Sequence, residues 1–150
     1  MMFASEQEMS KIFEKYLKER FGDSYLKECQ GLFGIPDFVV YSREKDETAV
    51  ISFELKLSDW KRAAKQAFRY RSFSNMSYVV MSAQKSAIAV NNIDLFKRYN
   101  IGLAKFNNDG LFEILHKPLS GKPYSDNLNR KLIQSIGPSI VKAKNVEVLL

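Results

Sequence analysis

The spacing of apolar and polar residues predicts helices and short strands that alternate along the chain. Between residues 5 and 20 the apolar side chains recur every three or four positions, and Ser5 with Glu8 three residues later is typical of a helix N-terminus. A second amphipathic helix is expected from about residue 59 to residue 73, and the apolar run SYVVMS follows it. Further strands are expected at residues 24–30, 37–42, 48–57, 101–106 and 111–116, and further helices near residues 92–99 and 125–136.

This order of elements predicts an α/β fold in which helices flank one sheet. The chain has a suitable length for a single domain, residues 1–150, with a sizeable core. We expect the core to span about residues 5–106 and a C-terminal extension to span about residues 117–150. The residues after 136 carry no pattern that predicts an element.

The segment IPDFVVYSREKDETAVISFELK predicts a hairpin that places two carboxylates opposite each other. A turn centred between Lys45 and Asp46 pairs positions whose numbers sum to 91, so Asp37 faces Glu54. Like charges directly across a strand pair repel and destabilise the sheet, and a bound cation would offset that repulsion. Mg²⁺ suits such a position because it prefers oxygen ligands and is held by one or two carboxylates.

Strand periodicity adds a lysine to this pair of carboxylates. In residues 48–57 the odd positions from Ala49 onward are apolar, so Ser52, Glu54 and Lys56 share the opposite face. A lysine beside a metal-binding carboxylate can orient the attacking water or offset charge on a phosphate. The alternative is an exposed hairpin with a surface Glu/Lys pair, since a Glu-x-Lys triplet alone is common. The three residues in one register favour phosphodiester hydrolysis.

These residues resemble the signature of the PD-(D/E)XK nuclease superfamily. Its Pro-Asp motif matches Pro36-Asp37, and its Asp/Glu-x-Lys motif matches residues 54–56. Gln66 and Tyr70 on the second helix match the QxxxY motif of the RecB-like branch. The family core is a helix, a three-stranded antiparallel meander, a second helix and a further strand, which corresponds to residues 5–81, about half of the chain. The resemblance implies a restriction-endonuclease-like core with a central mixed β-sheet.

The resemblance also implies a role for each matching residue. Two carboxylates and one main-chain carbonyl are expected to bind Mg²⁺ or Mn²⁺, and the lysine to assist the hydrolytic water. The glutamine and the tyrosine are expected to line the site near the substrate backbone. The expected metal ligands are thus Asp37, Glu54 and the carbonyl of Leu55, and the further catalytic residues are Lys56, Gln66 and Tyr70.

Many members of the family use a glutamate on the first helix as an additional ligand of the metal or of a water. Glu8 is the expected counterpart, because it lies one turn before Ile12 on the side that faces the core. Glu14 and Glu6 are alternatives. Equally, Glu8 is suited to complete a capping box with Ser5 and to take no part in the site.

The second helix carries a basic stripe formed by Arg62, Lys65 and Arg69. Residues at this spacing lie on one side of a helix, so the stripe can follow the phosphates on either side of the scissile bond. The alternative is a solvated face that serves solubility. For Tyr70, and for Phe68 and Phe73 near it, packing in the core is the competing interpretation.

Composition and charge favour some functional classes and argue against others. The net charge of +6 and the pI near 9.4 favour a polyanionic partner, although charge alone is a weak signal. One cysteine and one histidine exclude a Cys/His zinc cluster, and no phosphate-binding glycine motif predicts a nucleotide cofactor. No apolar run is long enough to span a membrane, and the first residues lack a secretory signal pattern, so the expected location is the cytoplasm.

The sequence therefore predicts a metal-dependent deoxyribonuclease, and the resemblance implies that it leaves a 5′ phosphate and acts in DNA repair, recombination or defence. Two alternatives stay open: a non-catalytic nucleic-acid-binding module that keeps the fold, and a nuclease subunit that is active only in a larger assembly. A homodimer would suit cleavage of both strands of a duplex, but no interface pattern is visible.

Overall fold

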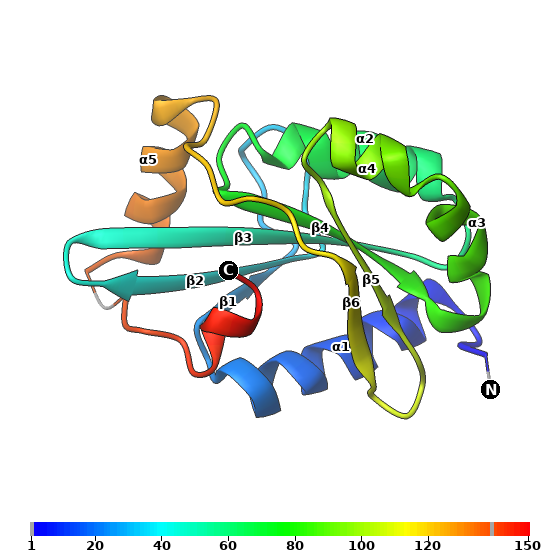
Figure 1. Ribbon diagram of the computed structural model, residues 1–150. Helices are drawn as coiled ribbons and strands as arrows, with labels where there is room; N and C mark the ends of the chain where they lie inside the picture. The colour runs from blue at the N-terminus through cyan, green and yellow to red at the C-terminus, as the bar shows by residue number, and fades with distance from the viewer. Residues whose placement is uncertain (1, 139) are drawn as a thin grey trace.

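The computed structural model describes residues 2–138 and 140–150, and these form one six-stranded mixed sheet flanked by helices (Figure 1). The strands lie in the order of the chain, and the two parallel pairs, β3 with β4 and β4 with β5, are joined by helical crossovers. The elements are α1 (Glu6–Phe21), β1 (Tyr25–Lys27), β2 (Phe38–Glu44), β3 (Glu47–Lys56), α2 (Trp60–Tyr70), β4 (Met76–Ser82), η1 (Ala83–Lys85), α3 (Ser86–Asn91), α4 (Ile93–Arg98), β5 (Gly102–Phe106), β6 (Phe112–His116), α5 (Asp126–Ile136) and η2 (Val146–Val148).

Helices cover both faces of the sheet because the strands bury side chains on both faces. Helix α1 packs on one face through Phe13 and its neighbours, against Phe53 and Phe106. Helices α2 and α4 lie together on the opposite face, as Figure 1 shows. There the small side chains Ala63 and Ala67 allow α2 to approach the sheet closely, as the sequence predicts.

The predicted register of the β2–β3 hairpin is confirmed. Phe38 pairs with Phe53 and Glu44 pairs with Glu47, so paired positions sum to 91 throughout. The three-stranded meander is also confirmed, since β1 pairs antiparallel with β2 and β2 with β3. The next position in this register places Asp37 level with Glu54, where the predicted site begins.

Several predicted boundaries differ from the structure. The first strand covers three residues instead of 24–30, because Glu28 adopts a left-handed φ of 51° and the chain leaves the sheet for a glycine-rich loop. Helix α2 ends at Tyr70, three residues early, in a turn where Phe73 N donates to Tyr70 O. The short helices η1 and α3 were not predicted, because helices of one or two turns carry little periodicity.

The C-terminal segment packs on the face of the sheet that α1 covers. Ala143 N donates to Ser42 Oγ at 2.9 Å, and the buried Tyr78 hydroxyl donates to Leu149 O at 2.6 Å. The buried side chains of Val146 and Leu149 join the core beneath α1. In the described part of the chain, no helix combines the length and the apolar character that crossing a membrane requires.

Candidate active site

The site lies just before the first residue of strand β2, where strand β3 extends beyond the end of its partner. Asp37 N donates to Phe53 O at 3.1 Å, which extends the hairpin by one position. The Asp37 carboxylate then turns toward β3, and its Oδ2 accepts from Leu55 N at 2.7 Å. The side chain therefore occupies the edge of β3 that β2 no longer covers. Because the N–H and C=O groups of a strand residue point to the same side, the carbonyl of Leu55 lies on this edge too.

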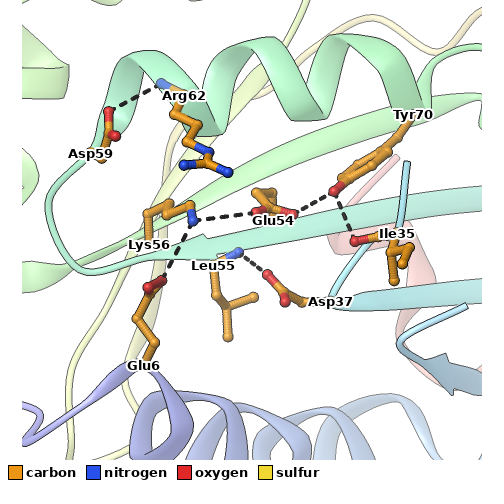
Figure 2. A network of polar contacts seen from close by, with 9 residues as sticks. All are labelled: Glu6, Ile35, Asp37, Glu54, Leu55, Lys56, Asp59, Arg62 and Tyr70. Atoms are coloured by element: carbon orange, nitrogen blue, oxygen red, sulfur yellow. Dashed lines mark hydrogen bonds and ion pairs between the residues drawn. The ribbon is translucent and has the colours of Figure 1, made fainter. Parts of the chain in front are cut away.

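Glu54 points to the face of β3 that α2 covers, and only 4% of its surface is exposed. Its Oε1 lies 2.6 Å from the Tyr70 hydroxyl, which also lies 2.9 Å from Ile35 O. Tyr70 is buried, so its ring packs in the core while its hydroxyl reaches the carboxylate (Figure 2). Tyr70 thus packs in the core, and its hydroxyl also contacts Glu54, one of the predicted site residues.

The two carboxylates lie in surroundings that disfavour their charged forms. Burial and the nearby charge of Asp37 raise the pKa of Glu54 to about 8. Burial also raises the pKa of Asp37, although the hydrogen bond from Leu55 N and the charge of Lys56 oppose that shift. Two desolvated carboxylates level with each other on neighbouring strands favour either a shared proton or a bound cation.

Lys56 supplies the positive charge at the site. Its Nζ lies 4.0 Å from Glu54 Oε2 and 3.9 Å from Glu6 Oε2, and its side chain is 19% exposed. Figure 2 shows the ammonium between the two acids, at the end of β3. Glu54 and Lys56 point to the same face of the strand, as the periodicity predicts.

The structure distinguishes the three glutamates of α1 that the sequence offers as candidates, Glu6, Glu8 and Glu14. Glu8 Oε1 accepts from Ala4 N at 3.1 Å while Glu8 N donates to Ser5 Oγ at 3.1 Å, so this residue takes part in the cap of α1. Glu14 accepts from the Tyr25 hydroxyl at 2.7 Å. Glu6, which the sequence leaves as an alternative, is the α1 glutamate whose carboxylate contacts Lys56.

The donor set at the site fits a hard divalent cation. Among the described residues no three His, Cys, Asp or Glu side chains gather into a metal-binding group, so protein carboxylates alone would not complete a coordination shell. Mg²⁺ needs only one or two carboxylates, because it keeps several waters and takes further oxygens from a phosphate substrate. Asp37 and Glu54, desolvated and mutually repelling, with the Leu55 carbonyl on the same edge, meet that requirement.

Helix α2 covers the site with one face and exposes its basic residues on another. Gln66 lies one turn before Tyr70, and its Oε1 is buried and has no hydrogen-bond partner among the described residues. Figure 2 shows Arg62 extending from α2 toward β3 and Lys56, and Asp59 Oδ1 accepts from Arg62 N at 3.2 Å. Lys65 and Arg69 are exposed, as is Arg62. Of the predicted stripe, Arg62 thus lies beside the site, while Lys65 and Arg69 follow it along the exposed face of α2.

The loop before Asp37 contributes a contact that the sequence pattern does not predict. Gly34 has a φ of +82°, and a Cβ at this position would lie 2.9 Å from Tyr70 Cε1. A side chain would therefore strain the backbone and displace the tyrosine from Glu54. The glycine-rich composition of the loop was visible, but its approach to Tyr70 depends on the packing of distant segments.

Comparisons of the chain with protein-family models, curated proteins and solved structures found no match, so the geometry of the site carries the functional argument.

Proposed function

We propose that this protein is a metal-dependent nuclease with a restriction-endonuclease-like core that hydrolyses phosphodiester bonds in DNA and leaves a 5′ phosphate. One observation carries the proposal: the confirmed hairpin register sets Asp37 and Glu54 side by side in desolvated surroundings, with Lys56 beside Glu54. Such a group costs stability unless it binds a cation or serves catalysis. The order of elements from α1 to β4 is consistent with the family core.

Each residue has a role that its position supports. Asp37, Glu54 and the carbonyl of Leu55 would hold the metal. A bound Mg²⁺ lowers the pKa of a water ligand and offsets charge on the phosphate oxygens. Lys56 carries its charge at the mouth of the site, where it can orient the attacking water or contact a non-bridging oxygen. Glu6, 3.9 Å from the ammonium, is a positioning residue for Lys56.

The experiment that tests this proposal is a cleavage assay on labelled single-stranded, duplex, flapped and four-way DNA, with Mg²⁺ or Mn²⁺ and with EDTA. Asp37→Asn keeps an oxygen that can accept from Leu55 N but removes the charge, and Lys56→Met keeps the length of the side chain without its ammonium. Lys105→Met is the matched control, because Lys105 is a strand lysine paired with Glu113 away from the site.

We expect metal-dependent cleavage that falls by at least about a hundredfold in both site variants, the scale on which a group that stabilises the transition state acts, and that persists in the control. Intact DNA in every arm, with the wild-type chain folded and loaded with metal, would contradict the proposal. Activity that emerges only when cell extract is added would identify a subunit of a larger assembly.

A further inference from the structure

Four aromatic side chains are exposed in the described residues, and all four belong to one surface. Phe33, Phe68, Tyr99 and Tyr124 are between 39% and 60% exposed, whereas the other aromatic side chains are buried or partly buried. Phe68, for which the sequence offered core packing as the alternative, points outward. Exposed aromatics cost free energy in water, so four on one surface require an explanation.

Direct contacts join these rings to each other and to arginines. The Phe68 ring lies 5.5 Å from the Tyr99 ring and 5.8 Å from the Tyr124 ring, measured between centroids. The Arg69 guanidinium lies 5.6 Å from the centroid of Phe33, which precedes the site by four positions. We call these four rings the aromatic row. It runs from the loop beside Asp37 across the end of α2 to α4 and the segment before α5.

A groove of about 430 Å³ between α2 and α4 adjoins the aromatic row. Its apolar lining includes Ala64, Leu95 and Ile101, together with Phe68 and Tyr99 of the row. Its volume lies within the range of about 300–1,000 Å³ that is usual for ligand pockets. Such a lining suits a flat apolar ring better than a phosphate.

Basic side chains around the groove would complement a ligand that also carries negative charge. Lys61, Lys65 and Arg69 line the groove, and none of the described residues that line it is acidic. All residues of α2 are apolar, basic or neutral, so no carboxylate on this helix opposes an anion. Lys65 and Arg69 also belong to the basic stripe with Arg62, which borders the active site. The groove and the site thus lie on either side of one cationic helix.

We propose that the aromatic row and its groove form a stacking platform for unpaired nucleotides, so the substrate of the adjacent site is DNA with a single-stranded segment. This inference rests on the proposed nuclease function. Bases stack on exposed aromatic rings only when they have left the duplex, while arginines and lysines follow the phosphates between them. A duplex presents sugar and phosphate edges to such a surface and leaves the rings without partners.

The test measures binding by fluorescence anisotropy in EDTA, with a labelled single strand and with its duplex. The variants are matched pairs, Tyr99→Leu against Tyr99→Phe and Tyr124→Leu against Tyr124→Phe, together with Phe68→Leu. Leu111→Ala is the surface control, because Leu111 is more exposed than any ring of the row and lies at the β5–β6 turn. Thermal melts confirm that each variant is folded. We expect this result because all the substituted positions are exposed.

We expect the single strand to bind more tightly than the duplex, each Leu variant to lose roughly tenfold in affinity for the single strand, and the Phe variants and the control to bind as the wild type does. Equal binding of both DNA forms, or wild-type affinity in all Leu variants, would overturn the proposal. Binding does not depend on catalysis. Cleavage that the Leu variants do not alter would overturn this inference and keep the nuclease. Stacking without cleavage would overturn the nuclease assignment, and with it the substrate inferred for the site, and would leave only the stacking platform.

Discussion

The Tyr70 hydroxyl lies within hydrogen-bond distance of two acceptors, Glu54 Oε1 and Ile35 O, but it has a single proton to donate. The Tyr70 hydroxyl can donate either to Glu54 Oε1 or to Ile35 O, but not to both. When Glu54 is protonated, its own hydroxyl donates to the tyrosine oxygen and the tyrosine donates to Ile35 O, so each group is satisfied. The pKa of Glu54 is raised by burial and by the nearby charge of Asp37, so the Mg²⁺ that we propose at this site would displace a proton at neutral pH.

The raised pKa predicts how stability depends on pH in the absence of metal. The pKa of Glu54 is about 8 in the folded state against 4.5 for the free side chain, so between these values the folded state holds a proton that the unfolded state has lost. The free energy of unfolding therefore falls as pH rises through this window, by at most about 1.4 kcal/mol per pH unit from this group. Burial of Asp37 adds a contribution of the same sign.

We expect Glu54→Gln to flatten this slope and to stabilise the metal-free protein at the upper end of the window, because the amide resembles the protonated acid. Urea denaturation in EDTA across the window measures both effects. A variant whose stability falls with pH as steeply as that of the wild type would show that Glu54 ionises normally in the folded chain.

Tyr70→Phe tests whether the hydroxyl supports the ionised carboxylate. The hydrogen bond from Tyr70 favours the charged form of Glu54, so its loss should weaken Mg²⁺ binding in a calorimetric titration. Tyr78→Phe is the matched control, since its buried hydroxyl donates to Leu149 O on the α1 face. Each variant should lose roughly 1–3 kcal/mol of stability, the scale for a buried acceptor left without its donor. Equal metal affinity in the two variants would contradict the role given to Tyr70.

At the scale of elements, α2 links the sheet, the site and the exposed cations. Its alanine face packs on β4 and β5, its Tyr70 contacts Glu54, and its basic face is open. The helix begins at the cap formed by Asp59, which accepts from Arg62 N. Because Arg62 belongs to the first turn, the order of that turn determines where its guanidinium lies.

We expect Asp59→Ala to lower the free energy of unfolding by about 1 kcal/mol, the usual loss when a helix cap is removed. Asp59→Asn should stay close to the wild type, since an asparagine caps equally well and lacks only the charge. Circular dichroism during thermal unfolding measures both variants. If both lose the same stability, the charge of Asp59 matters and its hydrogen bond to Arg62 N does not.

At the scale of the whole molecule, the C-terminal segment completes the core beneath α1. Leu149 is fully buried, whereas its neighbour Leu150 is 42% exposed. The segment also hydrogen bonds to β2 and β4 through Ser42 and Tyr78. It therefore stabilises the strands that carry the site without contributing a residue to it.

We expect Leu149→Ala to cost about 2–5 kcal/mol, which is the range for truncating a buried leucine. Leu150→Ala is the adjacent control and should change stability by no more than about 0.5 kcal/mol, as surface substitutions do. Urea denaturation compares the two variants. A small loss in Leu149→Ala would indicate that the tail leaves the core in solution.

The sequence alone determined the hairpin register, the shared face of Glu54 and Lys56, and the alanine face of α2. These features follow from local rules: strand side chains alternate with a period of two, helix faces repeat every three or four residues, and a short charged turn sets the pairing. The coarse α/β architecture follows from the order of the same elements, and local patterns also indicated the N-cap at Ser5.

The tertiary structure alone decided which distant groups meet. It brought Glu6 instead of Glu8 to Lys56, placed Gly34 against Tyr70, and gathered Phe33, Phe68, Tyr99 and Tyr124 on one surface. Periodicity cannot predict these contacts, because each joins segments whose relative position depends on how helices and loops pack on the sheet. The sequence does not show whether an aromatic residue is buried in the core or exposed to water, because tertiary packing determines its burial.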